Sequence, residues 1–218
     1  MISDPLSRKS HEFAQEIQKL LNSTLTQNVR INSAEFPFGQ GRLFMVAAGL
    51  SRSRLFRTSR FPLRTARGRP EIWMEISFQL HMDLEGEYLT VYKSFVGVFR
   101  DETTKVGLVH FDYERDKTDG YPDAHLQVQG YSEFLAELLP DRPLAKLHFP
   151  VGGKRFRPCL EDVIEFLIVE DLAQGASGWR EALKPGRERF QRKQLRAAMR
   201  RNPDIVREFM TDYPLDEA

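Results

Sequence analysis

Cysteine is almost absent from this chain, and Cys159 is the single thiol in 218 residues. One thiol excludes an internal disulfide and any zinc site built from several cysteines. No apolar run reaches the roughly 20 residues that a bilayer-spanning helix needs, and the opening MISDPLSRKS has no apolar signal region. We therefore expect a cytoplasmic protein with no membrane partner.

The chain also lacks the motifs of the common metal and nucleotide sites. It contains neither the HExxH pattern of zinc peptidases nor the GxxxxGK[ST] pattern of phosphate-binding loops. We therefore expect no cofactor and no metal ion.

Apolar residues, in contrast, are plentiful. They make up 41% of the chain and include 16 phenylalanines, which excludes a disordered protein. A chain of 218 residues suits one globular domain with helical additions. We predict an α+β core domain at residues 1–178, with an arginine-rich loop at 52–69, and a basic helical C-terminal extension at 179–218.

The spacing of apolar residues predicts an α+β fold in which helices pack on an antiparallel β-meander. Apolar and polar side chains alternate along residues 71–83, which is typical of a half-buried strand. Further strands are predicted at 42–50, 88–99, 106–114, 124–129 and 145–149. Helices are predicted at 5–22, 132–139, 160–172, 186–201 and 203–211, and the helix at 160–172 is expected to cover the apolar sheet face. Residues 23–41 are polar and interrupted by glycine and proline, so we assign no element to them.

The formal net charge of +1 conceals two strongly basic segments. Residues 52–69 hold seven arginines and no acid, and residues 184–201 hold eight basic residues and the single acid Glu188. Arginine with interleaved phenylalanine suits nucleic acid, because guanidinium groups pair with phosphates and stack on bases. The same segments suit an acidic partner protein, and they also suit surfaces that pair with this protein's own acids.

The candidate nucleic-acid-binding residues come from these two segments and from a short basic run before the helix at 160–172. They are Arg52, Arg54, Arg57, Arg60, Arg64, Arg67, Arg69, Lys154, Arg155, Arg157, Arg192, Lys193, Arg196 and Arg200.

Histidines occupy the polar side of several predicted strands. Alternation along 106–114 places His110, Asp112 and Glu114 on the face opposite to the apolar side chains. If the strands are neighbours, five residues converge as a candidate catalytic site: His110, Asp112, Glu114, His125 and His148. Imidazoles beside carboxylates suit general acid–base chemistry on a phosphodiester. The same pattern is also typical of the solvent-facing side of a one-sided antiparallel sheet.

Two further features lie before the helix at 160–172. A thiol at a helix N-terminus beside Arg155 and Arg157 would be reactive, whereas Cys159 followed by Asp162 also resembles a capping box. The glycine pair in PVGGKRFRP at 150–158 suits either a tight turn or backbone binding of a phosphate. We favour the capping box and the tight turn.

A local resemblance covers residues 110–168. HFDYERDKTDGYPDAHLQVQG at 110–130 and LHFPVGGKRFRPCLEDVIEFLI at 147–168 place an aromatic-Asp-Tyr strand, an acidic turn, a histidine strand and a helix in that order. This segment resembles uncharacterised bacterial proteins and, more loosely, the TumE-like toxin family. The resemblance implies Asp112, Glu114 and His125 as the matching positions and a toxin or phage-defence setting.

These observations together favour a bacterial protein that engages nucleic acid, RNA or DNA, through its arginine-rich segments. If it cleaves RNA, we expect His110 and His125 to act as acid and base, with Asp112 orienting a histidine. Arg155 or Arg157 would then stabilise the phosphorane. The alternative is a non-catalytic adaptor or regulatory subunit whose basic segments bind an acidic partner protein.

Overall fold

We analysed a computed structural model of the chain, which describes residues 4–38, 41–51, 57–83, 85–105 and 107–213. Its helices are α1 (Pro5–Thr24), α2 (Glu133–Leu138), α3 (Gly153–Phe156), α4 (Leu160–Val169), α5 (Trp179–Arg201) and α6 (Pro203–Asp212), with a 3-10 turn at Leu144–Lys146. Its strands are β1 (Ile31–Phe38), β2 (Gly41–Ala48), β3 (Phe61–Pro62), β4 (Trp73–Met82), β5 (Leu89–Phe99), β6 (Gly107–Glu114), β7 (Ala124–Val128) and β8 (Phe149–Pro150). The predicted α+β fold with an antiparallel meander is confirmed.

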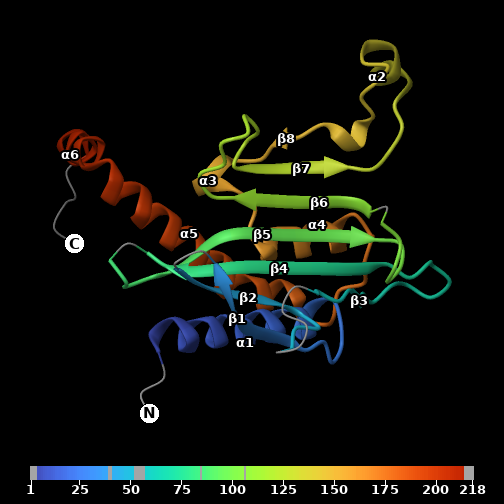
Figure 1. Cartoon of the computed structure of the whole chain (residues 1–218), viewed down its shortest axis with the longest axis horizontal. Coiled ribbons are helices and arrows are strands. Elements are labelled where there is room, and N and C mark those ends of the chain that lie inside the picture. Colours follow the sequence, from blue (N-terminus) through green and yellow to red (C-terminus); the bar gives the residue numbers. More distant parts are fainter. Residues whose placement is uncertain (1–3, 39–40, 52–56, 84, 106, 214–218) are drawn as a thin grey trace.

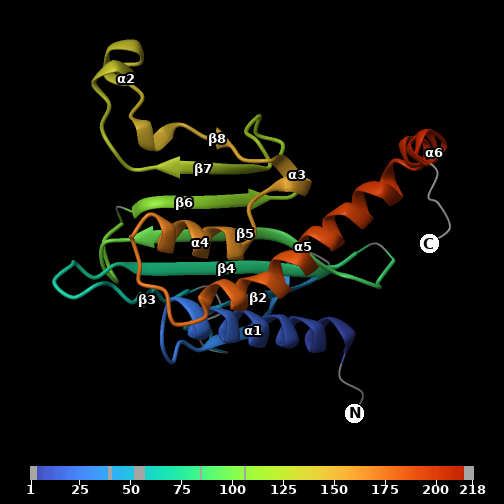
Figure 2. The same ribbon diagram turned by 180° about the vertical axis from the view of Figure 1, so that it is seen from behind.

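The strands form one antiparallel sheet in the order β1-β2-β4-β5-β6-β7-β8, and β3 pairs with β4 at one end. Helices α1, α4 and α5 lie on one face of this sheet, as Figure 2 shows. The opposite face is turned toward the viewer in Figure 1 and is called the open face below. The site described in the next section lies on the open face.

The core fills the space between the sheet and its helices. Met74, Ile76 and Leu80 alternate along β4 and are fully buried, as the period-two pattern predicts. Ile164 and Leu167 of α4 are buried in the same cluster. The apolar stripe of α4 therefore covers the sheet, in agreement with the sequence.

Helix α5 leaves this core part-way along its length. Leu183, in its second turn, is buried, and Gly186 allows close approach to α4, because a Cβ there would lie 1.9 Å from Glu161 Oε1. Arg187 pairs with Asp162 at 2.9 Å. Beyond this point α5 and α6 project from the body as an arm (Figure 1). The predicted division at residue 178 stays a prediction.

Residues 31–38 form β1, a strand that was not expected from the sequence. β1 pairs with β2 along its whole length, from Ile31 opposite Ala48 to Phe38 opposite Gly41. It is an edge strand, and an edge can include Pro37, because one side of its backbone needs no partner in the sheet. Because of Pro37, the sequence did not predict a strand here, although pairing with β2 stabilises one.

The strand predicted at 145–149 is wrong. Pro143 begins a 3-10 turn in which Lys146 N–H donates to Pro143 O at 2.8 Å, and pairing with β7 starts only at Phe149. β8 ends at Pro150, which has no N–H to extend the ladder.

None of the helices in the described residues is both long enough and apolar enough to cross a membrane.

Truncation of Ile164 tests the packing of α4 on the sheet. Ile164→Ala removes a side chain with no solvent exposure, so we expect the free energy of unfolding to fall by about 2–5 kcal/mol. Val169→Ala is the control on the same helix, because Val169 is 60% exposed. Urea unfolding measures both. Similar losses from the two variants would contradict the packing.

Candidate active site

The pairing of β6 with β7 assembles the candidate site. Asp112 lies opposite His125, and His110 lies opposite Gln127. All four side chains point to the open face, because Phe111 and Leu126, their neighbours along the strands, pack against the core cluster on the other face. The sequence-predicted convergence of the two histidines and Asp112 is therefore what the structure has.

Asp112 lies between the two imidazoles. Its Oδ2 atom is 3.4 Å from His110 Nε2 and 3.7 Å from His125 Nε2. The side chains of His110 and Asp112 are 31% and 27% exposed, so both reach solvent. The cluster is therefore a carboxylate flanked by two imidazoles at an accessible part of the sheet.

Hydrogen bonds of Gln127 fix the tautomer of His110. Gln127 Nε2 donates to Ala145 O at 3.0 Å, so its Oε1 atom is left to accept from His110 Nε2 at 2.6 Å. Neutral His110 therefore carries its proton on Nε2 and its lone pair on Nδ1. A lone pair on an accessible imidazole is what a general base needs.

His125 is buried, although its phase along the strand places it on the open face. It is only 4% exposed, and its Nδ1 atom donates to Pro122 O at 3.3 Å. Its Nε2 atom then faces the Asp112 carboxylate with a lone pair, and the 3.7 Å between Nε2 and Oδ2 is longer than a hydrogen bond. The contact between neutral His125 and Asp112 is therefore electrostatic.

His148 completes the cluster from outside β6 and β7. Its ring lies 4.6 Å from the His125 ring and 4.0 Å from the ring of Tyr121, which is 41% exposed. His148 follows the 3-10 turn that holds Ala145, and Ala145 accepts from Gln127. The segment between β7 and β8 therefore closes over the histidines and excludes water from His125.

Burial and positive charge keep two of these histidines neutral. Desolvation lowers the pKa of His125 below its ordinary value, and this outweighs the opposing effects of the Pro122 carbonyl and the Asp112 carboxylate. Desolvation, followed by the charge of Lys117, lowers the pKa of His148. Lys117 also opposes protonation of His125 and lies 5.5 Å from the Tyr121 ring. The site therefore holds a cation beside neutral imidazoles.

Aromatic rings border His110 on β5. The ring of Phe95 lies 5.5 Å from the His110 ring and 6.4 Å from that of Phe99. Gly97, between the two phenylalanines, lies opposite His110, and a Cβ there would come within 2.7 Å of both phenylalanine rings. Glycine thus permits the rings to close over the strand beside His110.

Glu114 does not join the histidines. Its carboxylate pairs with Lys93 of β5 at 3.0 Å. Glu114 is two residues beyond Asp112, and the strand carries it toward the end of the sheet. Glu114 is thus paired with a lysine rather than with the histidines, and its predicted role at the site stays a prediction.

Arg60 is committed to the fold rather than to a partner. Its guanidinium pairs with Glu75 at 3.2 Å, donates to Thr104 O at 2.6 Å and lies 3.4 Å from the centre of the Phe99 ring. Only 13% of its side chain is exposed. Arg60 therefore attaches this segment to the sheet, and the prediction that it contacts nucleic acid stays a prediction.

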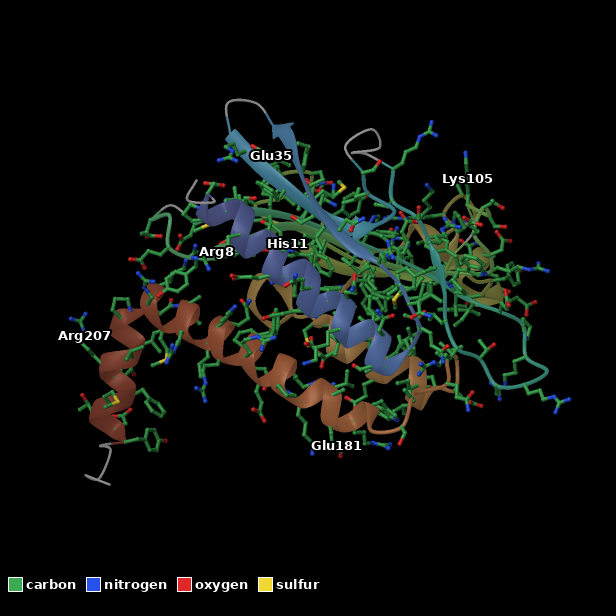
Figure 3. All side chains as sticks on the ribbon, turned by 90° about the horizontal axis from the view of Figure 1, so that it is seen from below. Arg8, His11, Glu35, Lys105, Glu181 and Arg207 are labelled. Atoms are coloured by element: carbon green, nitrogen blue, oxygen red, sulfur yellow. The ribbon has the colours of Figure 1, made fainter. Side chains whose placement is uncertain are left out.

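The other arginines of 52–69 differ in their surroundings. Arg69 pairs with Asp171 and donates to the Asp171 carbonyl at 2.7 Å. Arg57 and Arg67 are exposed, Arg64 is half-buried, and Arg52 and Arg54 lie outside the described residues. This segment lies near β3, at the end of the molecule opposite to the arm. In Figure 3, Arg207 of α6 lies at one end of the molecule, and Lys105, in the connection between β5 and β6, lies at the other.

The short basic run before α4 does not serve the histidine cluster as expected. The Arg157 guanidinium lies 3.8 Å from the Tyr113 ring, and Tyr113 points to the helix-covered face. The phosphorane-stabilising role of Arg157 stays a prediction. The side chains of Lys154 and Arg155 lie outside the described part of the chain. Gly152 takes a positive φ of 68°, where a Cβ would lie 2.0 Å from Phe156 O, which supports the tight turn.

The remaining candidates, Arg192, Lys193, Arg196 and Arg200, are exposed on the projecting part of α5. This arm leaves the body at the same end of the sheet as the turn between β6 and β7 (Figures 1 and 2).

Cys159 is a capping residue and not a reactive thiol. Asp162 Oδ2 accepts from the Cys159 backbone N–H at 2.9 Å and from its Sγ at 3.1 Å, as in the expected capping box. Burial, together with Glu161 and Asp162, raises the pKa of the thiol far above its ordinary value. The favoured capping role is confirmed.

Three residues of the site were not predicted from the sequence: Lys117, Tyr121 and Gln127. Gln127 carried a signal, because it shares the polar phase of His125. Lys117 and Tyr121 lie in the turn between β6 and β7, where no periodic pattern fixes the direction of a side chain. Within the described residues, no group of three or more His, Cys, Asp or Glu side chains is arranged to hold a metal ion.

Comparisons with known proteins identify no relative. No family model, no curated protein and no solved structure matches the chain. The resemblance of residues 110–168 to the TumE-like toxins stays a prediction.

The lowered pKa of His125 has a consequence for stability. The unfolded chain takes up protons near pH 6.5 while folded His125 resists them, so the free energy of unfolding falls as the pH drops from 7.5 through 6.5. We expect His125→Asn, whose amide can still donate to Pro122 O, to lose part of this pH dependence. Urea unfolding at pH 7.5, 6.5 and 5.5 measures it.

The control for this experiment is His11→Asn, because His11 is exposed on α1. It should retain the pH dependence of the unsubstituted protein. An unchanged slope in His125→Asn would contradict the assignment of a neutral, buried imidazole.

Proposed function

We propose that the chain is a ribonuclease that cleaves single-stranded RNA at the His110–Asp112–His125 cluster. The observation that carries this proposal is the position of the Asp112 carboxylate between an accessible imidazole and a buried one. The two imidazoles differ in exposure and in hydrogen bonding, so that only His110 is placed to exchange a proton with a substrate. The resemblance of residues 110–168 to the TumE-like toxins favours a toxin or phage-defence setting.

His110 acts as the general base. Its Nδ1 atom takes the proton of the ribose 2′-hydroxyl, and the 2′-oxygen then attacks the adjacent phosphorus. The bond from Nε2 to Gln127 holds the ring in one orientation while the proton moves to the other nitrogen. The ring of Phe95 limits the rotation of the imidazole from the side of β5.

The Asp112 carboxylate stabilises the imidazolium that His110 becomes, because Asp112 Oδ2 lies 3.4 Å from His110 Nε2. The proton that His110 has taken then passes from its Nδ1 atom to the 5′-oxygen as the bond between phosphorus and that oxygen breaks. His125 is too buried to touch RNA, so it acts only through Asp112, from which its Nε2 atom is 3.7 Å away. The products are a 2′,3′-cyclic phosphate and a 5′-hydroxyl.

Lys117 supplies the positive charge that the phosphorane needs. Its charge reaches both His125 and His148, and its Nζ atom pairs with Asp119 at 3.2 Å, so Asp119 would have to share it with the phosphate. Tyr121, exposed next to His148, offers a ring on which a base can stack. Single-stranded RNA suits this surface, because its bases are free to leave a stack.

Substitution of the two accessible groups tests the proposal. We expect His110→Ala and Asp112→Asn each to lower the cleavage rate of a short fluorescent single-stranded RNA by about 10²–10⁴-fold. The substitutions change groups that are 31% and 27% exposed, so the fold should be retained, and circular dichroism checks this. His11→Ala is the control and should cleave at the unsubstituted rate.

Two results would sink the proposal. One is an RNA that stays intact at high protein concentration, and the other is cleavage by His110→Ala and Asp112→Asn at the rate of the unsubstituted protein.

A further inference from the structure

The arm formed by the second half of α5 and by α6 carries apolar side chains that nothing in the described chain covers. No residue of α6 is buried. Six large apolar residues along the arm are between 43% and 65% exposed, namely Leu195, Met199, Ile205, Phe209, Met210 and Tyr213. An exposed apolar surface of this kind on a projecting element is typical of an interaction site.

The apolar side chains of α5 lie beside a row of positive charge. Leu195 and Met199 are four residues apart and so share one face of the helix. Arg192, Arg196 and Arg200 repeat at the same interval immediately beside them, and the Arg200 guanidinium also lies 6.0 Å from the centre of the Tyr88 ring. α5 therefore presents an apolar row with a basic row along one side.

Helix α6 also carries an apolar row with a charged row beside it, but its charged row is acidic. Ile205, Phe209 and Tyr213 form its apolar row at intervals of four residues. Asp204, Glu208 and Asp212 repeat at the same interval, one position before each apolar residue. The acidic row thus follows the apolar row along one edge.

The two helices of one chain cannot satisfy each other. The turn at Asn202–Pro203 directs α6 away from the axis of α5 (Figures 1 and 2). Pro203 begins α6 and fixes its own φ, so the turn cannot simply continue the first helix. The acidic row of a chain therefore stays apart from its own basic row.

We propose that the arm binds the arm of a second copy of this chain, so that α6 of each copy packs on α5 of the other. The apolar rows meet in the middle, and the acidic row of one copy faces the basic row of its partner. The contact is self-complementary, so a twofold axis closes it and leaves neither copy with an unpaired row. This dimer does not depend on the proposed ribonuclease activity.

Charge and apolar burial favour a second copy over nucleic acid at this surface. Phosphates would pair with Arg192, Arg196 and Arg200, but Asp204, Glu208 and Asp212 would repel them, and the apolar rows would stay in water. A second copy would pair with the basic row, pair with the acidic row and cover the apolar rows, all with residues that the chain already has.

The oligomeric state of the full chain tests this dimer. Sedimentation equilibrium from 1 to 100 µM should give twice the chain mass at the upper end of the range. Phe209→Asp should give the mass of one chain throughout, because it places a charge in the apolar row. Phe134→Asp is the matched control: Phe134 of α2 is 72% exposed, away from the arm, and the variant should dimerise normally.

A charge exchange tests the pairing of the rows. Arg196→Glu and Glu208→Arg should each weaken dimerisation at least 10-fold, and the double variant should recover most of it, since the exchanged charges at positions 196 and 208 again face a charge of opposite sign in the other copy. A monomeric chain at 100 µM would overturn the proposal, as would a dimer that survives Phe209→Asp. Loss of RNA binding in Arg196→Glu, with the unsubstituted chain a monomer, would assign the arm to nucleic acid instead.

Discussion

The register between β6 and β7 is the constraint on which the candidate site depends. It sets Asp112 opposite His125 and, two residues along, His110 opposite Gln127. Side chains alternate along a strand, so a slip of one residue in either strand would send half of these groups into the helix-covered core. The apolar residues of both strands oppose such a slip, because it would expose Phe111 and Leu126. The same packing that forms the core therefore fixes the geometry of the polar groups.

The segment between β7 and β8 makes the two imidazoles of the candidate site, His110 and His125, different from each other. Its Ala145 carbonyl orients Gln127, which orients His110, and its His148 packs on His125. One imidazole stays accessible and the other is withdrawn from water. Their chemical difference thus arises from a loop that crosses the sheet edge, and the loop is held in turn by the residues it covers.

The sheet and α4 were predictable because strand and helix periods dominate their sequences. Alternation along β4 and β6 predicted which side chains are buried, and it placed His110 and Asp112 on one face with His125. Periodicity predicted less about the edge strands and the turns. Pro37 concealed β1, and Pro143 and Pro150 shortened the last strand, because their effect depends on which backbone groups have partners. Alternation also does not specify the partner of a polar side chain, and so it did not predict that Glu114 pairs with Lys93.

The basic segments show that the distribution of charge along the sequence also leaves the contacts of individual side chains undetermined. A run of arginines in sequence does not specify what each guanidinium contacts: Arg60 and Arg69 pair with acids of this chain, and the two segments lie at opposite ends of the molecule. Function therefore follows from the contacts of individual groups, above all those of Asp112. The most direct measurement of its role is the chemistry of the ends left on a short single-stranded RNA, identified by mass spectrometry. The account predicts 2′,3′-cyclic phosphate and 5′-hydroxyl ends that vanish with Asp112→Asn, whereas ends of any other kind, or the same ends from that variant at an undiminished rate, would contradict it.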